Sequence, residues 1–204
     1  MIQNRNRRIL TVTSAPRKQV RAAAVQGALG ERSTFLVLNR RPGSRSQGIL
    51  IVGGRAVPCA IGRSGISGLK REGDGATPKA PMRLLKVLWR PDRGPPPKTL
   101  LPRGAIQAGD GWCDAAFDAN YNRFVPLPYA KSHEALARDD ALYDIVVVLD
   151  WNYTRRLQGR GSAIFLHLAR PGFLPTEGCI AVTPAAMRWL LGRLAPAATV
   201  RVNG

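Results

Sequence analysis

Short hydrophobic runs, separated by glycine, proline and charged residues, dominate the chain from residue 34 onward. The runs TFLVLN, GILIVG and AVPCAIG follow one another between residues 34 and 62, and MRLLKVLW occupies residues 82–89. Apolar runs of this length that end in turn residues are typical of β-strands. Three such runs in close succession predict an antiparallel meander.

Two later runs are apolar along their whole length. YDIVVVLDW (residues 143–151) is typical of a central strand that is buried on both faces, and SAIFLHL (residues 162–168) is expected to be the next strand. The segment TVRVN (residues 199–203) predicts a last strand.

Helical patterns are confined to two segments. Thr183 and Pro184 form a favourable N-cap and first-turn pair, and hydrophobic residues then recur at helical spacing. These residues are Met187, Leu190, Leu191 and Leu194. SHEALARDD (residues 132–140), with Ser132 as N-cap, is a weaker candidate for a short helix. The predicted fold class is mostly β, a sandwich or meander with one or two helices packed on the sheet.

The N-terminal segment has a different composition. Residues 1–33 are polar and basic and are expected to form a flexible tail, whereas residues 34–204 are expected to form a single domain. Arg7 and Arg8 resemble the start of a twin-arginine export signal. Pro16 and the basic residues after it interrupt the hydrophobic region that such a signal requires.

The chain is strongly basic, with 31 Lys and Arg against 13 Asp and Glu and a formal net charge of +18. Such a charge attracts nucleic acid, anionic membranes or carboxylate-rich polymers. A basic helix interleaved with aromatic residues is missing, so we expect a solvated arginine-rich surface without a specific nucleic-acid partner. No apolar stretch reaches the roughly 18 to 20 residues of a membrane-spanning helix, so no membrane span is predicted.

Cysteine usage limits the candidate chemistry. The three cysteines, Cys59, Cys113 and Cys179, are scattered and lack paired C-x-x-C spacing, which argues against a disulfide framework and a zinc site. No metal or organic cofactor is predicted. Cys59 lies in an apolar run and is expected in the core, and acidic neighbours disfavour the thiolate of Cys113.

The segment FLHLARPGFLPTEGCIAV (residues 165–182) carries the candidate chemistry. His167 ends a predicted buried strand, and Cys179 follows twelve positions later, directly after Gly178. A nearby imidazole can activate a thiol, and the N–H groups around Gly178 and Cys179 could hold an oxyanion. From spacing alone, thiol acyl transfer and a buried cysteine beside a structural histidine remain equally open.

His167 and the motif Thr176-x-Gly178-Cys179-Ile180 resemble the signature of the L,D-transpeptidase family, the YkuD-type catalytic domain. Upstream, Thr77 and Pro78 in GDGATPKAPMRL are similar to another stretch of that family. The resemblance covers roughly residues 48–202 and implies the L,D-transpeptidase catalytic-domain fold. Glu177 stands in place of a second histidine, and Ala181 in place of an arginine that contacts the substrate carboxylate, so the chain resembles a divergent branch.

The resemblance implies a cysteine acyltransferase that acts on peptidoglycan stem peptides in the periplasm or cell envelope. Cys179 would attack the carbonyl of the third stem residue and expel the terminal D-amino acid, with His167 as general base and then general acid. The Leu168 carbonyl would orient the imidazole. The thioester would pass to the amine of a neighbouring stem, giving a 3→3 cross-link, or to a protein lysine or water.

Residues outside the motif are candidates for substrate binding. Trp112, Asn122 and Arg123 lie in a polar, aromatic segment that could line a groove, although a loop held by its own side chains is the other reading. Arg123 and Arg170 could replace the missing arginine as carboxylate partners, and Thr176 belongs to the motif. His133 is expected to be exposed and without a role.

Two other functions compete with this interpretation. Papain-like and NlpC/P60-like peptidases place the cysteine before the histidine, and sortases need a longer separation, so other thiol enzymes fit poorly. The alternative from another class is a non-catalytic basic β-domain that binds anionic glycan or nucleic acid. Glu177 and Ala181 are the residues that favour it.

Overall fold

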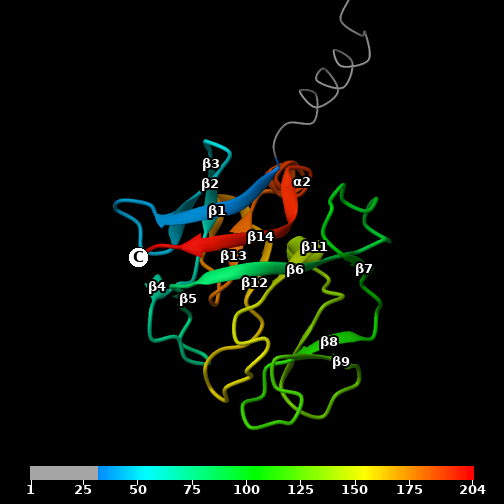
Figure 1. Ribbon diagram of the computed structural model, residues 1–204. Coiled ribbons are helices and arrows are strands. Elements are labelled where there is room, and N and C mark those ends of the chain that lie inside the picture. The colour runs from blue at the N-terminus through cyan, green and yellow to red at the C-terminus, as the bar shows by residue number, and fades with distance from the viewer. Residues whose placement is uncertain (1–31) are drawn as a thin grey trace, which may run out of the picture. The chain divides into compact units, whose positions relative to one another are not determined.

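The computed structural model describes residues 32–204 (Figure 1). Of the tail expected in residues 1–33, residues 1–31, with the export-signal pattern, lie outside the described residues, whereas Ser33 already begins strand β1. The strands are β1 (Ser33–Arg40), β2 (Gln47–Val52), β3 (Arg55–Ala60), β4 (Ile66–Ser67), β5 (Thr77–Pro78), β6 (Pro81–Trp89), β7 (Arg103–Ala105), β8 (Asp110–Cys113), β9 (Arg123–Pro126), β10 (His133–Ala135), β11 (Ile145–Leu149), β12 (Phe165–Leu168), β13 (Ile180–Val182) and β14 (Leu194–Val202). The helical elements are the 3₁₀ turns η1 (Ala141–Tyr143) and η2 (Pro171–Phe173) and the α-helix α2 (Pro184–Leu191).

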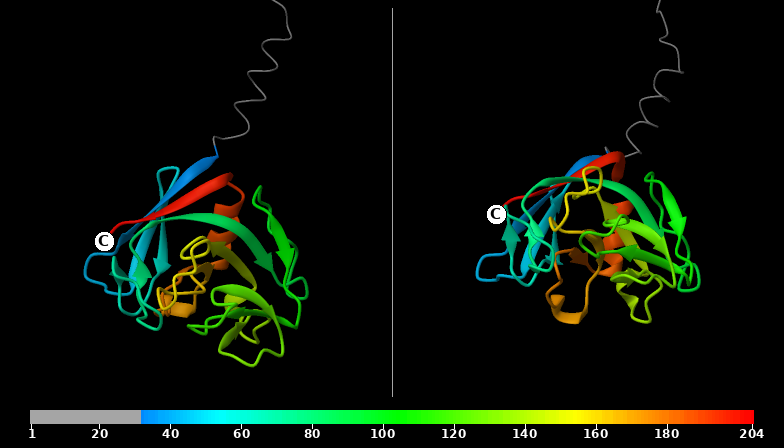
Figure 2. Two further views of the ribbon diagram at one scale, coloured as in Figure 1. Left: turned by 60° about the horizontal axis from the view of Figure 1, so that its bottom comes forward. Right: turned by 90° about the horizontal axis from the view of Figure 1, so that it is seen from below.

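Nine strands form the main sheet, in the order β11-β12-β13-β3-β2-β1-β14-β6-β7. Because β6 also pairs with β11, the sheet closes on itself into a barrel-like structure, and its strands curve around a common interior (Figure 2). β1, β2 and β3 pair antiparallel in succession, as the meander prediction requires. The prediction of a mostly β fold is confirmed.

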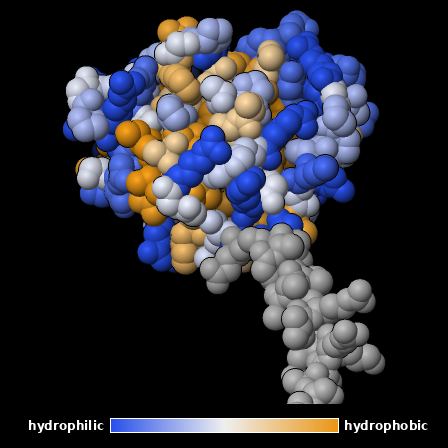
Figure 3. Space-filling model, turned by 90° about the horizontal axis from the view of Figure 1, so that it is seen from above, coloured by the Kyte–Doolittle hydropathy of each residue, from blue (hydrophilic) through white to orange (hydrophobic). Residues whose placement is uncertain are grey.

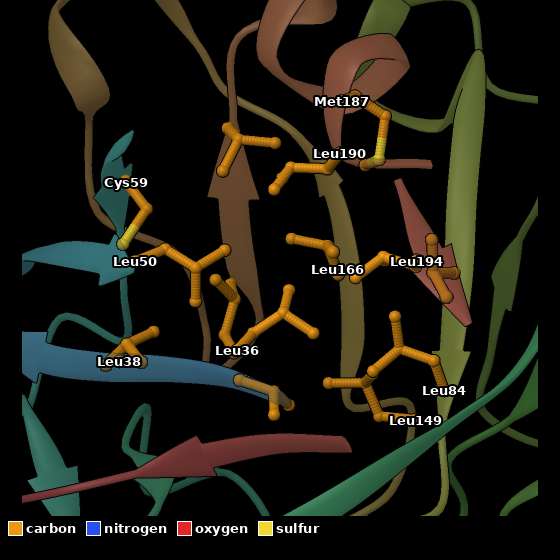
Figure 4. Packing of buried hydrophobic residues seen from close by; sticks show 14 of the residues in the cluster. Leu36, Leu38, Leu50, Cys59, Leu84, Leu149, Leu166, Met187, Leu190 and Leu194 are labelled. Carbon is orange, nitrogen blue, oxygen red and sulfur yellow. The ribbon is translucent and has the colours of Figure 1, made fainter. Parts of the chain in front are cut away.

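The main hydrophobic core fills the interior of the barrel. Leu36, Leu50 and Leu166 converge there from different strands (Figure 4). The helix α2 adds the buried side chains of Met187 and Leu190 to this core. The helix begins where the sequence predicted, since the Thr183 side chain accepts a hydrogen bond from the Ala186 N–H and Pro184 occupies the first turn.

A second core lies on the outer side of β11 and β12. Because side chains alternate along a strand, Val147 points into the barrel while Val146 and Val148 point outward. These outward residues pack with Phe165, Trp112 and residues near a small sheet of order β10-β8-β9. Burial on both faces explains why the β11 sequence is apolar throughout.

The helix considered for residues 132–140 is not formed. His133–Ala135 is strand β10, which pairs antiparallel with β8 so that Glu134 lies opposite Trp112. Leu136, next in the chain, is fully buried in the second core. Pairing and burial here outweigh the helix-favouring composition of the segment.

Figure 3, which views the molecule from above relative to Figure 1, shows hydrophobic side chains gathered between hydrophilic ones on this face. Trp189, which is partly buried, lies beneath two guanidinium groups, with Arg55 at 4.5 Å and Arg193 at 4.7 Å from its ring centroid. No helix within residues 32–204 is long and apolar enough to cross a membrane.

Candidate active site

His167 and Cys179 come from neighbouring parallel strands. In the β12–β13 register His167 lies opposite Ala181, and Cys179 precedes β13 by one residue. Residues two apart on a strand share a face, so Cys179, Ala181, His167 and Phe165 all project to the outer side of the barrel. His167 and Cys179 line one pocket of about 260 Å³. The structure therefore brings the two predicted catalytic side chains to the same cavity.

The His167 imidazole is held in one orientation. Its Nδ1 lies 2.8 Å from the Leu168 carbonyl oxygen. Because a carbonyl only accepts hydrogen bonds, Nδ1 carries the proton and Nε2 is left with its lone pair. Burial lowers the pKa of His167 to about 4, so the ring is neutral near pH 7. A neutral imidazole with a free Nε2 is suited to act as a base.

Tyr143 supports the same ring from the side. Its ring packs edge-on against the imidazole of His167, with 5.4 Å between centroids, and edge-on against Phe165. Tyr143 is itself buried in the second core. The orientation of His167 is thus set by a hydrogen bond on one side and by aromatic packing on the other.

The Cys179 sulfur is almost enclosed, with 8% of the residue exposed. Its thiol donates to the Ala163 carbonyl at 3.1 Å, and Sγ accepts the Phe165 N–H at 3.3 Å. Burial raises the pKa of Cys179 to about 12, and the charge of Glu134 acts in the same direction. The cysteine and histidine therefore rest as a neutral pair, and the thiol must lose its proton during the reaction.

Thr176 fixes the loop before the nucleophile. Its Oγ1 donates to the Cys179 carbonyl at 2.7 Å and accepts the Gly178 N–H at 3.2 Å. The Gly178 N–H is thus already engaged. Within residues 32–204 the Cys179 N–H donates no hydrogen bond, which makes it the backbone donor available to a developing oxyanion.

Gly178 is required by its surroundings. Its φ is +133°, which L side chains rarely adopt, and a Cβ there would lie 2.8 Å from the Ala76 carbonyl oxygen. Gly62 approaches the same segment, since a Cβ on it would lie 2.3 Å from the Gly75 carbonyl oxygen. The position of the loop that carries Cys179 is therefore set by direct contact between its backbone and the backbone around Ala76.

Replacing Gly178 by alanine is expected to destabilise the protein by about 1–3 kcal/mol more than Gly159→Ala. Gly159 also has a positive φ, +70°, but nothing lies within 4 Å of its added Cβ. The control also places alanine at a positive φ, but at +70° the backbone lies in the left-handed region that L residues adopt at lower cost than +133°, and the control lacks the collision. Urea unfolding of both variants measures the difference, and equal losses would contradict the close contact.

The remaining predicted site residues divide into two groups. Arg170 lines the pocket beside Thr176 and Cys179. Trp112, Asn122 and Arg123 do not line it: Trp112 and Asn122 are buried, and the Arg123 guanidinium donates to the Tyr153 carbonyl at 2.6 Å.

Asn122 is nonetheless connected to the nucleophile through hydrogen bonds to Ala163. Its Oδ1 accepts hydrogen bonds from Trp112 Nε1 at 3.0 Å and from the Ala163 N–H at 3.1 Å. Ala163 is the residue whose carbonyl accepts the Cys179 thiol. The polar segment that suggested a substrate groove thus satisfies buried backbone groups instead.

Two positions at which the chain departs from the motif lie at the pocket. Glu177 is exposed and forms an ion pair with Arg63 at 2.8 Å. Ala181 is buried and contributes only a methyl group, so the pocket has no guanidinium at this position.

Three other residues line the pocket although no sequence motif identifies them as site residues. Glu134, Arg138 and Tyr143 line the pocket although they lie far from Cys179 in the chain. The Arg138 guanidinium lies 5.1 Å from the Tyr143 ring centroid and forms an ion pair with Asp140 at 2.7 Å. Glu134 lies on β10, which pairs with β8, and Tyr143 lies on η1, just before β11; no sequence motif marks either position.

The other cysteines are placed differently. Cys59 lies in the barrel core, where burial raises its pKa to about 12. Cys113 is fully buried, and burial raises its pKa as well. In the described part of the chain, no group of three or more His, Cys, Asp or Glu side chains is placed to hold a metal ion.

A model of a known protein family matches most of the chain. The model of the L,D-transpeptidase catalytic domain family matches residues 44–202, which includes His167, Cys179 and the whole segment between them. No curated protein and no solved structure matches the chain. The family match covers most of the sequence, as the resemblance predicted, and the chain belongs to the L,D-transpeptidase catalytic domain family.

Proposed function

We propose that this protein is a cysteine acyltransferase of peptidoglycan, with Cys179 as nucleophile and His167 as general base. Its family generally cross-links peptidoglycan through a cysteine. The observation that carries the proposal is the shared pocket, in which a thiol and an imidazole with a free Nε2 lie on one face of adjacent strands.

The first half-reaction follows from the neutral resting pair. As Sγ approaches the carbonyl of the third stem residue, Nε2 of His167 accepts the thiol proton, and a C–S bond forms. The Cys179 N–H faces the oxygen that gains charge. The tetrahedral intermediate collapses when the amine of the terminal D-amino acid leaves with the proton from His167, which leaves a thioester.

The second half-reaction reverses these roles. An amine from a neighbouring stem attacks the thioester, His167 takes a proton from the attacking nitrogen, and the sulfur leaves and is reprotonated. The product is a 3→3 cross-link. Water or a protein lysine in place of the stem amine gives hydrolysis or protein attachment. The substrate requires that the protein act in the periplasm or cell envelope.

The proposal is tested by incubating the protein with a tetrapeptide stem donor and an amine acceptor. The expected result is a gain in intact protein mass equal to a bound tripeptide stem, release of the terminal D-amino acid, and a cross-linked product. Binding of the donor without a mass gain or release would contradict the proposal. It would favour the non-catalytic basic β-domain, for which the missing arginine at Ala181 is the supporting observation.

A further inference from the structure

Glu134 places a carboxyl group on the wall of the pocket that holds Cys179. Strand β10 carries this residue, and its carboxyl Oε2 accepts a hydrogen bond from the Tyr143 hydroxyl. Among residues 32–204, no hydrogen bond or ion pair uses Oε1. Oε1 is not one of the fully enclosed side-chain atoms that lack a partner, so this oxygen keeps some exposure on a residue that lines the pocket.

Two other charged residues that line the pocket form ion pairs with residues other than Glu134. Arg138 pairs with Asp140 and stacks on Tyr143, and Glu177 pairs with Arg63. Glu134 is therefore the carboxylate of this pocket that forms no ion pair within the described residues. Burial raises the pKa of Glu134, and the nearby charge of Arg138 only partly offsets this. Ionising a half-buried carboxylate without an ion-pair partner is costly, and a cation supplied by a ligand would reduce that cost.

We propose that Glu134 binds a primary ammonium group of the substrate inside the catalytic pocket. The proposal rests on the acyl-transfer function above and adds a subsite to it. One free carboxylate oxygen suits an ammonium, which is a compact point donor, better than the planar fork of a guanidinium, which pairs with two oxygens.

Two parts of the substrate carry this chemistry. One is the side-chain amine of the diamino acid whose carbonyl Cys179 attacks, and the other is the incoming acceptor amine. Either one would also offset the charge of Glu134, which raises the pKa of the Cys179 thiol. Occupation of the subsite therefore favours the thiolate at the moment when substrate is present.

The test compares Glu134→Gln with Glu177→Gln. The first variant keeps an amide oxygen for the Tyr143 hydroxyl and removes the charge, while the control removes a pocket carboxylate that is exposed and paired with Arg63. One arm measures thioester formation with a donor that has a free side-chain amine and with its N-acetylated analogue. The other arm measures how the thioester divides between an amine acceptor and water.

For Glu134→Gln we expect a loss of about tenfold or more in one preference, for the free over the acetylated donor or for amine over water. The affected arm identifies which amine is bound. If Glu134→Gln loses no more preference than Glu177→Gln in either arm, the subsite is wrong. If the wild-type protein forms no thioester, the acyl-transfer function itself fails.

Discussion

A Cys179→Ala protein is expected to form no covalent adduct with a stem-peptide donor and to release no terminal D-amino acid. Over residues 32–204, Cys179 carries the only thiol that lines the pocket with the free imidazole, and alanine removes the atom that would form the thioester. Intact-protein mass spectrometry after incubation with the donor measures the adduct.

Cys113→Ala is the matched control. Cys113 is also a buried, free cysteine whose pKa is raised, but it does not line the pocket. Its replacement is expected to leave the adduct intact. An adduct that survives in Cys179→Ala and disappears in Cys113→Ala would identify Cys113 as the nucleophile and contradict the proposal.

Replacing His167 by alanine is expected to slow thioester formation about 10²–10⁴-fold, the usual contribution of a positioned general base. The effect should be at the upper end of this range, because the Cys179 thiol has a pKa of about 12 and gains little thiolate unaided near pH 7. Single-turnover kinetics of acylation measure the loss. His133→Ala, which removes the other histidine of the chain, should leave the rate unchanged.

The pH dependence of the wild-type protein follows from the same residue. His167 must be neutral to accept a proton, and burial lowers its pKa to about 4. Acylation should therefore persist below pH 6 and be lost as the pH falls through about 4. A loss centred near the ordinary histidine pKa of about 6.5 would show that the ring is hydrated when substrate binds.

The strands of the barrel were predictable because local pattern and tertiary environment agree. β6 alternates exposed and buried residues from Pro81 to Leu84, and β11 is apolar because both of its faces are covered. Residues 132–140 were predicted incorrectly for the opposite reason. The composition of this segment favours a helix, and it does not reveal that the segment will pair with β8. That pairing decides the conformation of His133–Ala135.

The site was predictable only where its residues lie within one motif. Thr176, Gly178 and Cys179 share a loop, and His167 lies on the adjacent strand, so a short segment of sequence contains them all. Glu134 comes from a different sheet and has no fixed spacing to them. The polar segment with Trp112 and Asn122 was misleading because hydrogen-bonding side chains serve equally for ligand binding and for buried backbone groups.

The backbone contact between Gly178 and Ala76 has an evolutionary consequence. The position of the sulfur depends on two main chains that meet without intervening side chains, and Gly62 repeats this arrangement nearby. The exposed side chain at position 177 can therefore change in size or charge at the entrance while the reacting atom stays in place. A change of donor or acceptor at this entrance requires no redesign of the nucleophile.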